Sequence, residues 1–195
     1  MCYNNFMMPG SKDLLTTTSF HTEVSTTTVL KTAKKMIDYS HGNLHDINHF
    51  MKVYAYAKMI ADGEQLDPDT QKLVEMTALV HDIACPLCRV KYGNTNGKNQ
   101  EKESAALIAE FFKDSNLPQD FTDRISFLVS HHHTLDQIDG IDYQIIIEAD
   151  YLVNADESHF SGHNIKNMYD KIFKTETGKF LLRSMYQNCL ENETL

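Results

Sequence analysis

The sequence predicts an all-α protein with a single domain, and three observations support this. Apolar residues recur at helical spacing in one segment after another, no segment alternates as a half-buried β-strand does, and there is no internal repeat. The chain has 195 residues, of which 42% are hydrophobic and 23% charged. A chain of this length can bury about 70% of its unfolded surface in one core. We expect a compact helical bundle over residues 25–195, preceded by a flexible, threonine-rich arm over residues 1–24.

Charge and hydropathy exclude several classes of function. The net charge is −9 and no Lys/Arg cluster occurs, which argues against a groove for extended nucleic acid. A small phosphorylated substrate stays compatible, because a bound cation reverses the local field. No signal peptide or run of about 18 apolar residues is visible, so we expect a cytoplasmic protein without a membrane segment. Four scattered cysteines do not predict a disulfide framework, and Cys85-x-x-Cys88 lacks the second pair of a zinc ribbon.

The first half of the bundle has recognisable helix boundaries. Ser25–Thr28 offers N-caps for a first helix, which Gly42 ends, and Asp67-Pro68 is typical of a helix start. We therefore expect helices over about 25–40, 44–61 and 68–83. Pro86 is expected to end the third helix.

Residues 84–99 are expected to be the longest irregular stretch of the domain. A loop of this length without an element of its own is usually functional. Its cations Arg89, Lys91 and Lys98 could receive a substrate phosphate. A solvated surface loop is the alternative interpretation.

The second half has the same helical pattern. A helix over about 101–113 is followed by one that begins at Pro118 and ends in His131-His132-His133. A deeply apolar helix is expected over about 141–156, and packing helices near 165–174 and 178–189.

Four ionisable side chains lie within these apolar helical patterns. His49 shares a helix face with Val53, and a histidine so placed is more often a hydrogen-bonded core residue than a metal ligand. His81-Asp82 stands inside an apolar run, and so does Asp150. We expect Asn154, one turn after Asp150, to support that carboxylate. Burying such groups is unfavourable unless they are paired or bind a metal ion.

The order of these residues resembles the HD-domain superfamily of metal-dependent phosphohydrolases. The resemblance covers residues 40–180, and its sharpest matches are HDINH at 45–49, VHDI at 80–83 and EADYL at 148–152. It implies a helical bundle of the HD type. It also implies that the metal ligands are His49, His81, Asp82 and Asp150.

Two imidazoles and two carboxylates suit Mn²⁺, Fe²⁺, Co²⁺, Ni²⁺ or Zn²⁺ better than an all-oxygen cage would. The resemblance implies hydrolysis of a small phosphate ester, with nucleotides as one candidate class, by a hydroxide held on the ion. Asp82 is then both a ligand and a catalytic residue.

The histidine triplet leaves the number of ions open. In the dinuclear HD-GYP branch, a comparable histidine pair binds a second metal together with a histidine near the start of the preceding helix. Here that start reads QEKE at 100–103, and no Gly-Tyr-Pro follows Gly140. We expect His131 and His132 to be second-metal ligands or proton donors, with Glu101 as a weaker candidate for the acid.

Three alternatives to a mononuclear phosphohydrolase remain. A dinuclear phosphodiesterase or an HD-like oxygenase would use the same fold, and a non-catalytic sensor would use the site to bind a metal ion or a nucleotide. The sequence leaves a homodimer open.

Overall fold

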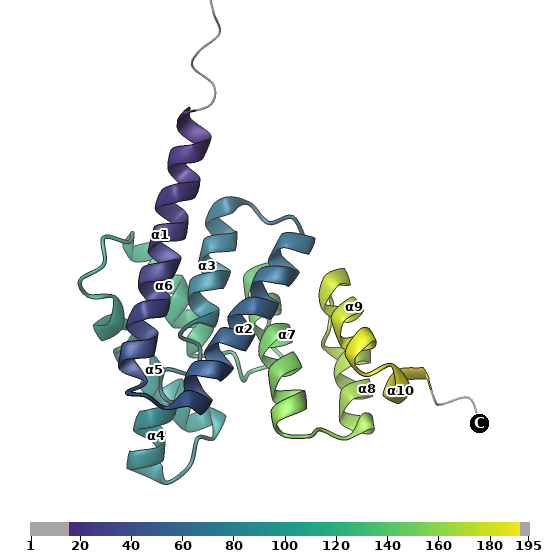
Figure 1. Cartoon of the computed structure of the whole chain (residues 1–195). Coiled ribbons are helices and arrows are strands. Elements are labelled where there is room, and N and C mark those ends of the chain that lie inside the picture. The colour runs from purple at the N-terminus through teal and green to yellow at the C-terminus, as the bar shows by residue number, and fades with distance from the viewer. Residues whose placement is uncertain (1–15, 192–195) are drawn as a thin grey trace, which may run out of the picture.

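The computed structural model describes residues 16–191, and over that range the chain forms ten α-helices without a β-strand (Figure 1). This confirms the predicted all-α class. The bounds are α1 Thr16–Tyr39, α2 Leu44–Gly63, α3 Pro68–Ala78, α4 Cys85–Tyr92, α5 Gly97–Phe112, α6 Gln119–Val129, α7 Ile141–Glu157, α8 Gly162–Lys171, α9 Glu176–Met185 and α10 Gln187–Glu191.

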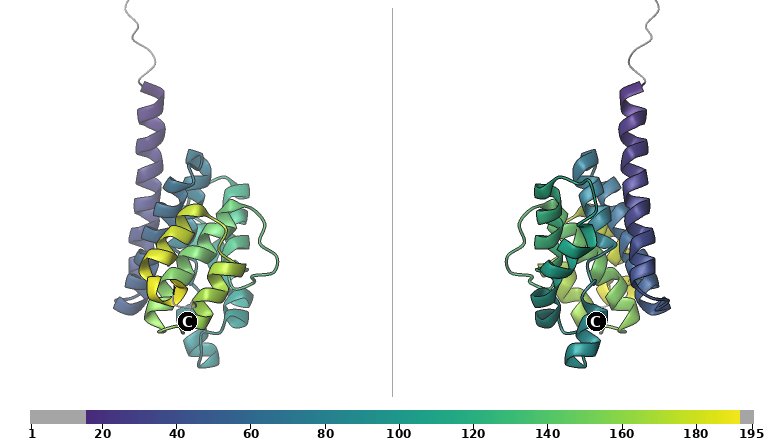
Figure 2. Two further views of the ribbon diagram at one scale, coloured as in Figure 1. Left: turned by 90° about the vertical axis from the view of Figure 1, so that its right-hand side faces the viewer. Right: turned by 90° about the vertical axis from the view of Figure 1, so that its left-hand side faces the viewer.

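Helices α2, α3 and α7 form the centre of the bundle, because each packs against the other two. The α5–α6 pair lies on one side of this centre and α8–α10 lie on the other (Figure 1). Helix α1 packs against α3, and Figure 2 shows its N-terminal turns extending beyond the other helices. Side chains at the centre therefore come from two consecutive helices and from a third that lies much later in the sequence.

The apolar core consists of two clusters. One joins α1, α3, α5 and α6 and includes the buried side chains of Met76, Ile108 and Ile125. The other joins α2, α7 and the C-terminal helices, with Ile60 and Ile145 among its buried members. Helix α7 is buried over most of its length, which explains why apolar residues occur on every face of it.

Helix α1 begins earlier than the sequence predicts. Residues 16–24 belong to the helix, so they are not part of an irregular arm, and residues 1–15 of that arm lie outside the described residues. Threonine lowers helix propensity by only a fraction of a kcal/mol per residue. A threonine-rich segment can therefore extend a helix that is stabilised further along the chain.

The third helix and the predicted loop after it differ from expectation. Helix α3 ends at Ala78, and residues 79–84, including His81 and Asp82, form turns. Pro86 lies in the first turn of α4 and so begins a helix, because its fixed φ suits that position and its missing N–H is not needed there. The prediction that residues 84–99 are irregular is wrong, because α4 and the start of α5 occupy most of this range.

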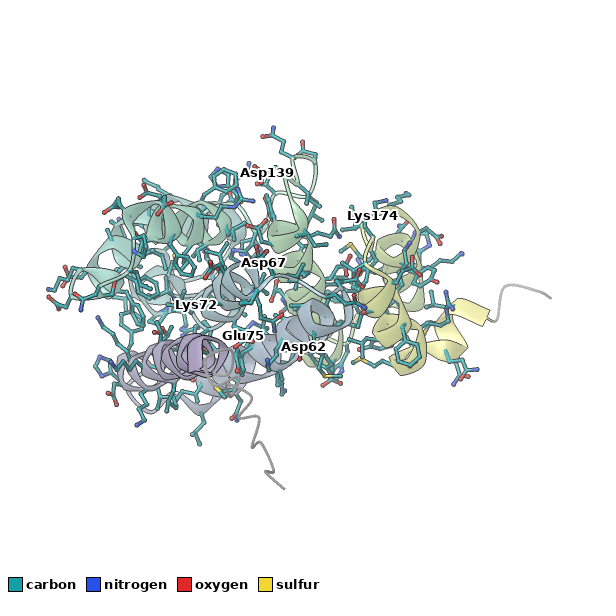
Figure 3. All side chains as sticks on the ribbon, turned by 90° about the horizontal axis from the view of Figure 1, so that it is seen from above. Asp62, Asp67, Lys72, Glu75, Asp139 and Lys174 are labelled. Atoms are coloured by element: carbon teal, nitrogen blue, oxygen red, sulfur yellow. The ribbon has the colours of Figure 1, made fainter. Side chains whose placement is uncertain are left out.

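The end of the bundle that faces the viewer in Figure 3 contains a polar cluster that joins α2 to α3. Glu75 is nearly buried there and accepts hydrogen bonds from Lys58 and Gln71, both at 2.9 Å. Gln71 also donates to Asp62 at 2.8 Å. These partners satisfy the buried carboxylate, so the cluster stabilises the fold.

None of the helices in the described part of the chain has both the length and the hydropathy that a bilayer span requires.

Candidate metal centre

The four predicted ligands come from three central elements of the bundle. His49 lies in the first half of α2, His81 and Asp82 in the turns that follow α3, and Asp150 in the second half of α7. His49, His81 and Asp150 are buried, and Asp82 is partly exposed. The packing of α2, α3 and α7 brings these side chains together at one point.

Their donor atoms converge closely. The Nε2 atoms of His49 and His81 are 3.1 Å apart, and Asp150 Oδ1 is 3.4 Å from each. Asp82 Oδ2 lies 3.7 Å from His49 Nε2 and 3.9 Å from His81 Nε2. Donors bound at about 2.1 Å to one ion lie about 3.0–3.4 Å apart in octahedral or tetrahedral geometry. His49, His81 and Asp150 meet this spacing for one ion, and Asp82 lies a few tenths of an ångström outside it.

In both His49 and His81, a hydrogen bond at Nδ1 determines where the lone pair of Nε2 points. His81 Nδ1 donates to the Ala78 carbonyl at 2.8 Å, and His49 Nδ1 donates to Glu157 Oε2 at 2.9 Å. With Nδ1 protonated, the Nε2 atom of a neutral imidazole is an acceptor. Two acceptors that face each other at 3.1 Å repel unless a cation or a proton lies between them. The donor set therefore fits a metal ion.

The pKa values show how the centre behaves without an ion. Burial lowers the pKa of His49, but the hydrogen bond to Asp150 and the charges of Asp82 and Asp150 outweigh it and raise the pKa to about 9. Burial also opposes ionisation of Asp150, yet its contacts with His49 and His81 hold the pKa of that carboxyl well below its usual range. The carboxylates thus favour positive charge at this point, as either a proton or a metal ion.

His132 lies behind Asp82. It is buried, its Nδ1 donates to the Val129 carbonyl at 2.9 Å, and its Nε2 is 3.2 Å from Asp82 Oδ1. Asp82, His132 and His133 each place one possible ligand atom within 4.8 Å of the others. Of the two histidines selected from the triplet by sequence, His132 belongs to the site. His133, which was not selected, lies next to it.

The other two predicted acid candidates stabilise a turn. His131 Nδ1 donates to the Phe127 carbonyl at 2.7 Å, and the two rings stack with centroids 4.4 Å apart. Glu101 accepts a hydrogen bond from Thr134 Oγ1 at 2.9 Å. Among the described residues, neither His131 nor Glu101 belongs to a group that could hold a metal ion.

Of the three predicted phosphate-binding cations, the structure places one beside the centre. Arg89 lines the pocket at the metal ligands and forms an ion pair with Asp46. Lys91 pairs with Glu103 at 2.8 Å on the surface of α4 and α5. Lys98 is exposed near the start of α5 and does not line the pocket.

The pocket has a volume of about 180 Å³, and its wall is part polar and part apolar, with Phe50 and Cys85 among the lining residues. Of the four candidate ligands, His49 and Asp82 line it. Its other polar lining residues are His45, Asp46, Arg89, Thr95, Asn154, Glu157 and Ser158. The proposed ion would therefore be accessible from solvent through this opening.

The sequence predicted the residue that supports Asp150, but the residue that supports His49 was missed. Asn154 donates to Asp150 Oδ1 at 2.8 Å, as its position one turn later predicts. Glu157, which binds His49, was missed because the helix was expected to end at residue 156. The spacing of Asp150, Asn154 and Glu157 at i, i+4 and i+7 places them on one helix face and was the available signal.

A protein-family model described as HD domain matches residues 46–156, more than half of the chain. The chain belongs to the HD domain family. The match includes all four candidate ligands, which confirms the resemblance seen in the sequence. A comparison with curated proteins finds no match.

Membership of this family implies the superfamily of metal-dependent phosphohydrolases, and HD domains bind divalent metal ions. The His/Asp groups of this HD domain protein are suitable for such an ion. Glu157 lies one residue beyond the matched segment.

Proposed function

We propose that this HD domain protein hydrolyses small phosphate esters with a divalent transition-metal ion held by His49, His81, Asp82 and Asp150. One observation supports this proposal most strongly. Two imidazole lone pairs and two carboxylates converge, with Nε2 atoms 3.1 Å apart, beside an open pocket that His49 and Asp82 line. A centre with only a structural role has no need of such an opening.

The mixed nitrogen and oxygen donors suit Mn²⁺, Fe²⁺, Co²⁺, Ni²⁺ or Zn²⁺. When bound, such an ion lowers the pKa of water and polarises a phosphoryl oxygen. A substrate in the pocket would contact Asp82 and His49, which line it. His132 holds Oδ1 of Asp82, so that Oδ2 is the oxygen directed at His49 and His81.

Arg89 is the pocket cation best placed to bind the phosphate. A guanidinium matches two phosphoryl oxygens in a fork, and here it reaches the pocket from α4. In the structure, the carboxylate of Asp46 forms an ion pair with this guanidinium. A phosphate group would compete with the Asp46 carboxylate for the guanidinium. Anions that do not also contact the metal ion would therefore bind more weakly.

The size and chemistry of the pocket favour a small hydrophilic ester. At about 180 Å³ it is smaller than the roughly 300–1,000 Å³ typical of pockets for larger ligands. Its wall offers hydroxyl and amide groups from Thr95, Asn154 and Ser158. We infer a phosphorylated alcohol or sugar, with any nucleobase of a nucleotide left outside.

A metal-supplemented assay of phosphate release tests this function. The panel contains sugar phosphates, glycerol phosphate, nucleoside monophosphates and a phosphodiester, each with Mn²⁺, Co²⁺, Ni²⁺ or Zn²⁺. We expect turnover of at least one monoester and a loss of at least about 100-fold in Asp82→Ala, because that residue is both a proposed ligand and part of the pocket lining. Equal behaviour of the wild type and Asp82→Ala on every substrate and metal would contradict the proposal.

A dinuclear phosphodiesterase is the second candidate, because Asp82, His132 and His133 could hold a further ion beside the first. Two bound ions per chain and preferential cleavage of the phosphodiester would favour it. Metal binding without turnover of any ester would favour a non-catalytic sensor.

A further inference from the structure

We propose that Glu157 is a positioning residue for the metal centre, which fixes the ring of His49 through its Nδ1 atom. The inference rests on the metal centre of the proposed function and concerns a residue outside the matched HD segment. Glu157 Oε2 is 2.9 Å from His49 Nδ1, and its other oxygen, Oε1, accepts from Lys52 at 2.9 Å.

The geometry is that of a carboxylate acting through a histidine on a metal ion. A carboxylate can only accept, so His49 must place its proton on Nδ1 and direct the Nε2 lone pair at the point where His81 and Asp150 converge. Outer carboxylates of this kind fix the ring orientation and raise the basicity of the ligand.

Helix α7 supplies this contact together with the ligand itself. Asp150 is the carboxylate ligand, Asn154 donates to it from one turn later, and Glu157 lies one further turn along the same face. One helix face therefore orients two of the four candidate ligands, Asp150 directly and His49 across the interface with α2.

Lys52 provides the comparison with a purely structural role. It lies one turn after His49 on α2, its side chain is 49% exposed, and it binds the Glu157 oxygen that faces away from His49. If the Glu157 contacts only linked α2 to α7, loss of either partner of the surface ion pair would have a similar small effect. If Glu157 positions His49, loss of Glu157 weakens metal binding and loss of Lys52 does not.

The test measures Zn²⁺ affinity of the full chain by competition with a chelator. We expect Glu157→Ala to bind Zn²⁺ about 10–100-fold more weakly than the wild type. Glu157→Gln should lie between them, because an amide oxygen still accepts from Nδ1 but carries no charge. Lys52→Ala should stay within about threefold of the wild type, as expected for an exposed ion pair.

A second readout follows the His49 ring itself. In ¹⁵N NMR spectra of the Zn²⁺-loaded protein, a protected Nδ1 proton is expected in the wild type and in Glu157→Gln and is expected to be lost in Glu157→Ala. Circular dichroism checks that each variant is folded.

Two results would overturn the proposal alone: Zn²⁺ affinity in Glu157→Ala equal to that of the wild type, or equal losses in Glu157→Ala and Lys52→Ala. Absence of Zn²⁺ binding by the wild type would instead overturn the metal centre and this proposal with it.

Discussion

At the scale of single residues, His81 shows how a buried polar side chain is constrained by its partners. The residue is fully buried, its Nδ1 donates to the Ala78 carbonyl, and its Nε2 points at His49 and Asp150. Buried polar atoms are nearly always hydrogen-bonded or bound to metal, because an unpaired one is costly. Both ring nitrogens of His81 face a polar partner, and His81 belongs to a group of side chains that could hold a metal ion.

The adjacent histidines His131 and His132 allow a matched test at this scale. We expect His132→Ala to weaken Zn²⁺ binding by about 10–100-fold, because it removes the protonated ring whose Nε2 donates to Asp82 Oδ1 while its Nδ1 donates to the Val129 carbonyl. His131→Ala should leave Zn²⁺ affinity within about threefold, because its contacts are with Phe127. Chelator competition measures both variants, and the reverse order of effects would contradict the placement of His132 at the site.

At the scale of elements, α7 connects the metal centre to the C-terminal helices. Its buried residue Glu148 accepts hydrogen bonds from Lys174 N at 2.6 Å, from Thr175 N at 3.1 Å and from Gln144 Nε2 at 2.7 Å. The carboxylate thereby lies at the N-terminus of α9, where backbone N–H groups and the helix dipole favour negative charge. The contact anchors α9 against the helix that contains Asp150.

The close approach of α9 to Glu148 predicts that Gly178→Ala is destabilising. An added Cβ would overlap the Glu148 carboxylate and the Thr175 hydroxyl, and overpacking of this kind costs about 1–3 kcal/mol. At Gly162 the nearest side-chain atoms are at an ordinary 3.5 Å, so Gly162→Ala is the matched control and should not destabilise. Urea unfolding measures both, and equal free energies of unfolding in the two variants would contradict the packing described for α9.

The elements also show what could be predicted from the sequence. Helices α2 and α7 were predicted within two residues of their observed ends, because their apolar patterns are long. Helix α4 was missed, since its eight residues are too few for the period to be recognised. Pro86 was predicted to end one helix but begins the next. The fixed φ and missing N–H of proline are compatible with either position.

At the scale of the whole molecule, the site depends on contacts that no local pattern contains. The types of these residues and their order along the chain were sufficient to select His49, His81, Asp82 and Asp150, because ionisable residues are unusual in apolar runs. The hydrogen bonds of His132 to Asp82 and of Glu157 to His49 join residues 50 and 108 positions apart. Only the packing of the helices determines such pairs.

The cluster of charges also predicts how stability depends on pH in the metal-free protein. Because the pKa of His49 is raised from an ordinary 6.5 to about 9, its protonation stabilises the fold. That contribution is fully present below pH 6.5 and is lost as the pH rises through 9. The expected loss is about 3 kcal/mol, at about 1.4 kcal/mol per pH unit over this range.

Urea unfolding of chelator-treated protein at pH 6.5 and 9.5 measures this effect. His49→Gln is the control, because it removes the titrating group, and its free energy of unfolding should change much less between the two pH values. An equal change in the wild type and the control would show that His49 is not the group responsible.

The metal content of protein purified without chelator shows whether the four candidate ligands bind an ion. Elemental analysis should give about one transition-metal ion per chain in the wild type, or two if Asp82, His132 and His133 bind a second ion. His49→Ala and Asp150→Ala should each reduce this content strongly, while Asp139→Ala, which changes an exposed carboxylate away from the centre, should not. Full metal content in both His49→Ala and Asp150→Ala would contradict the account.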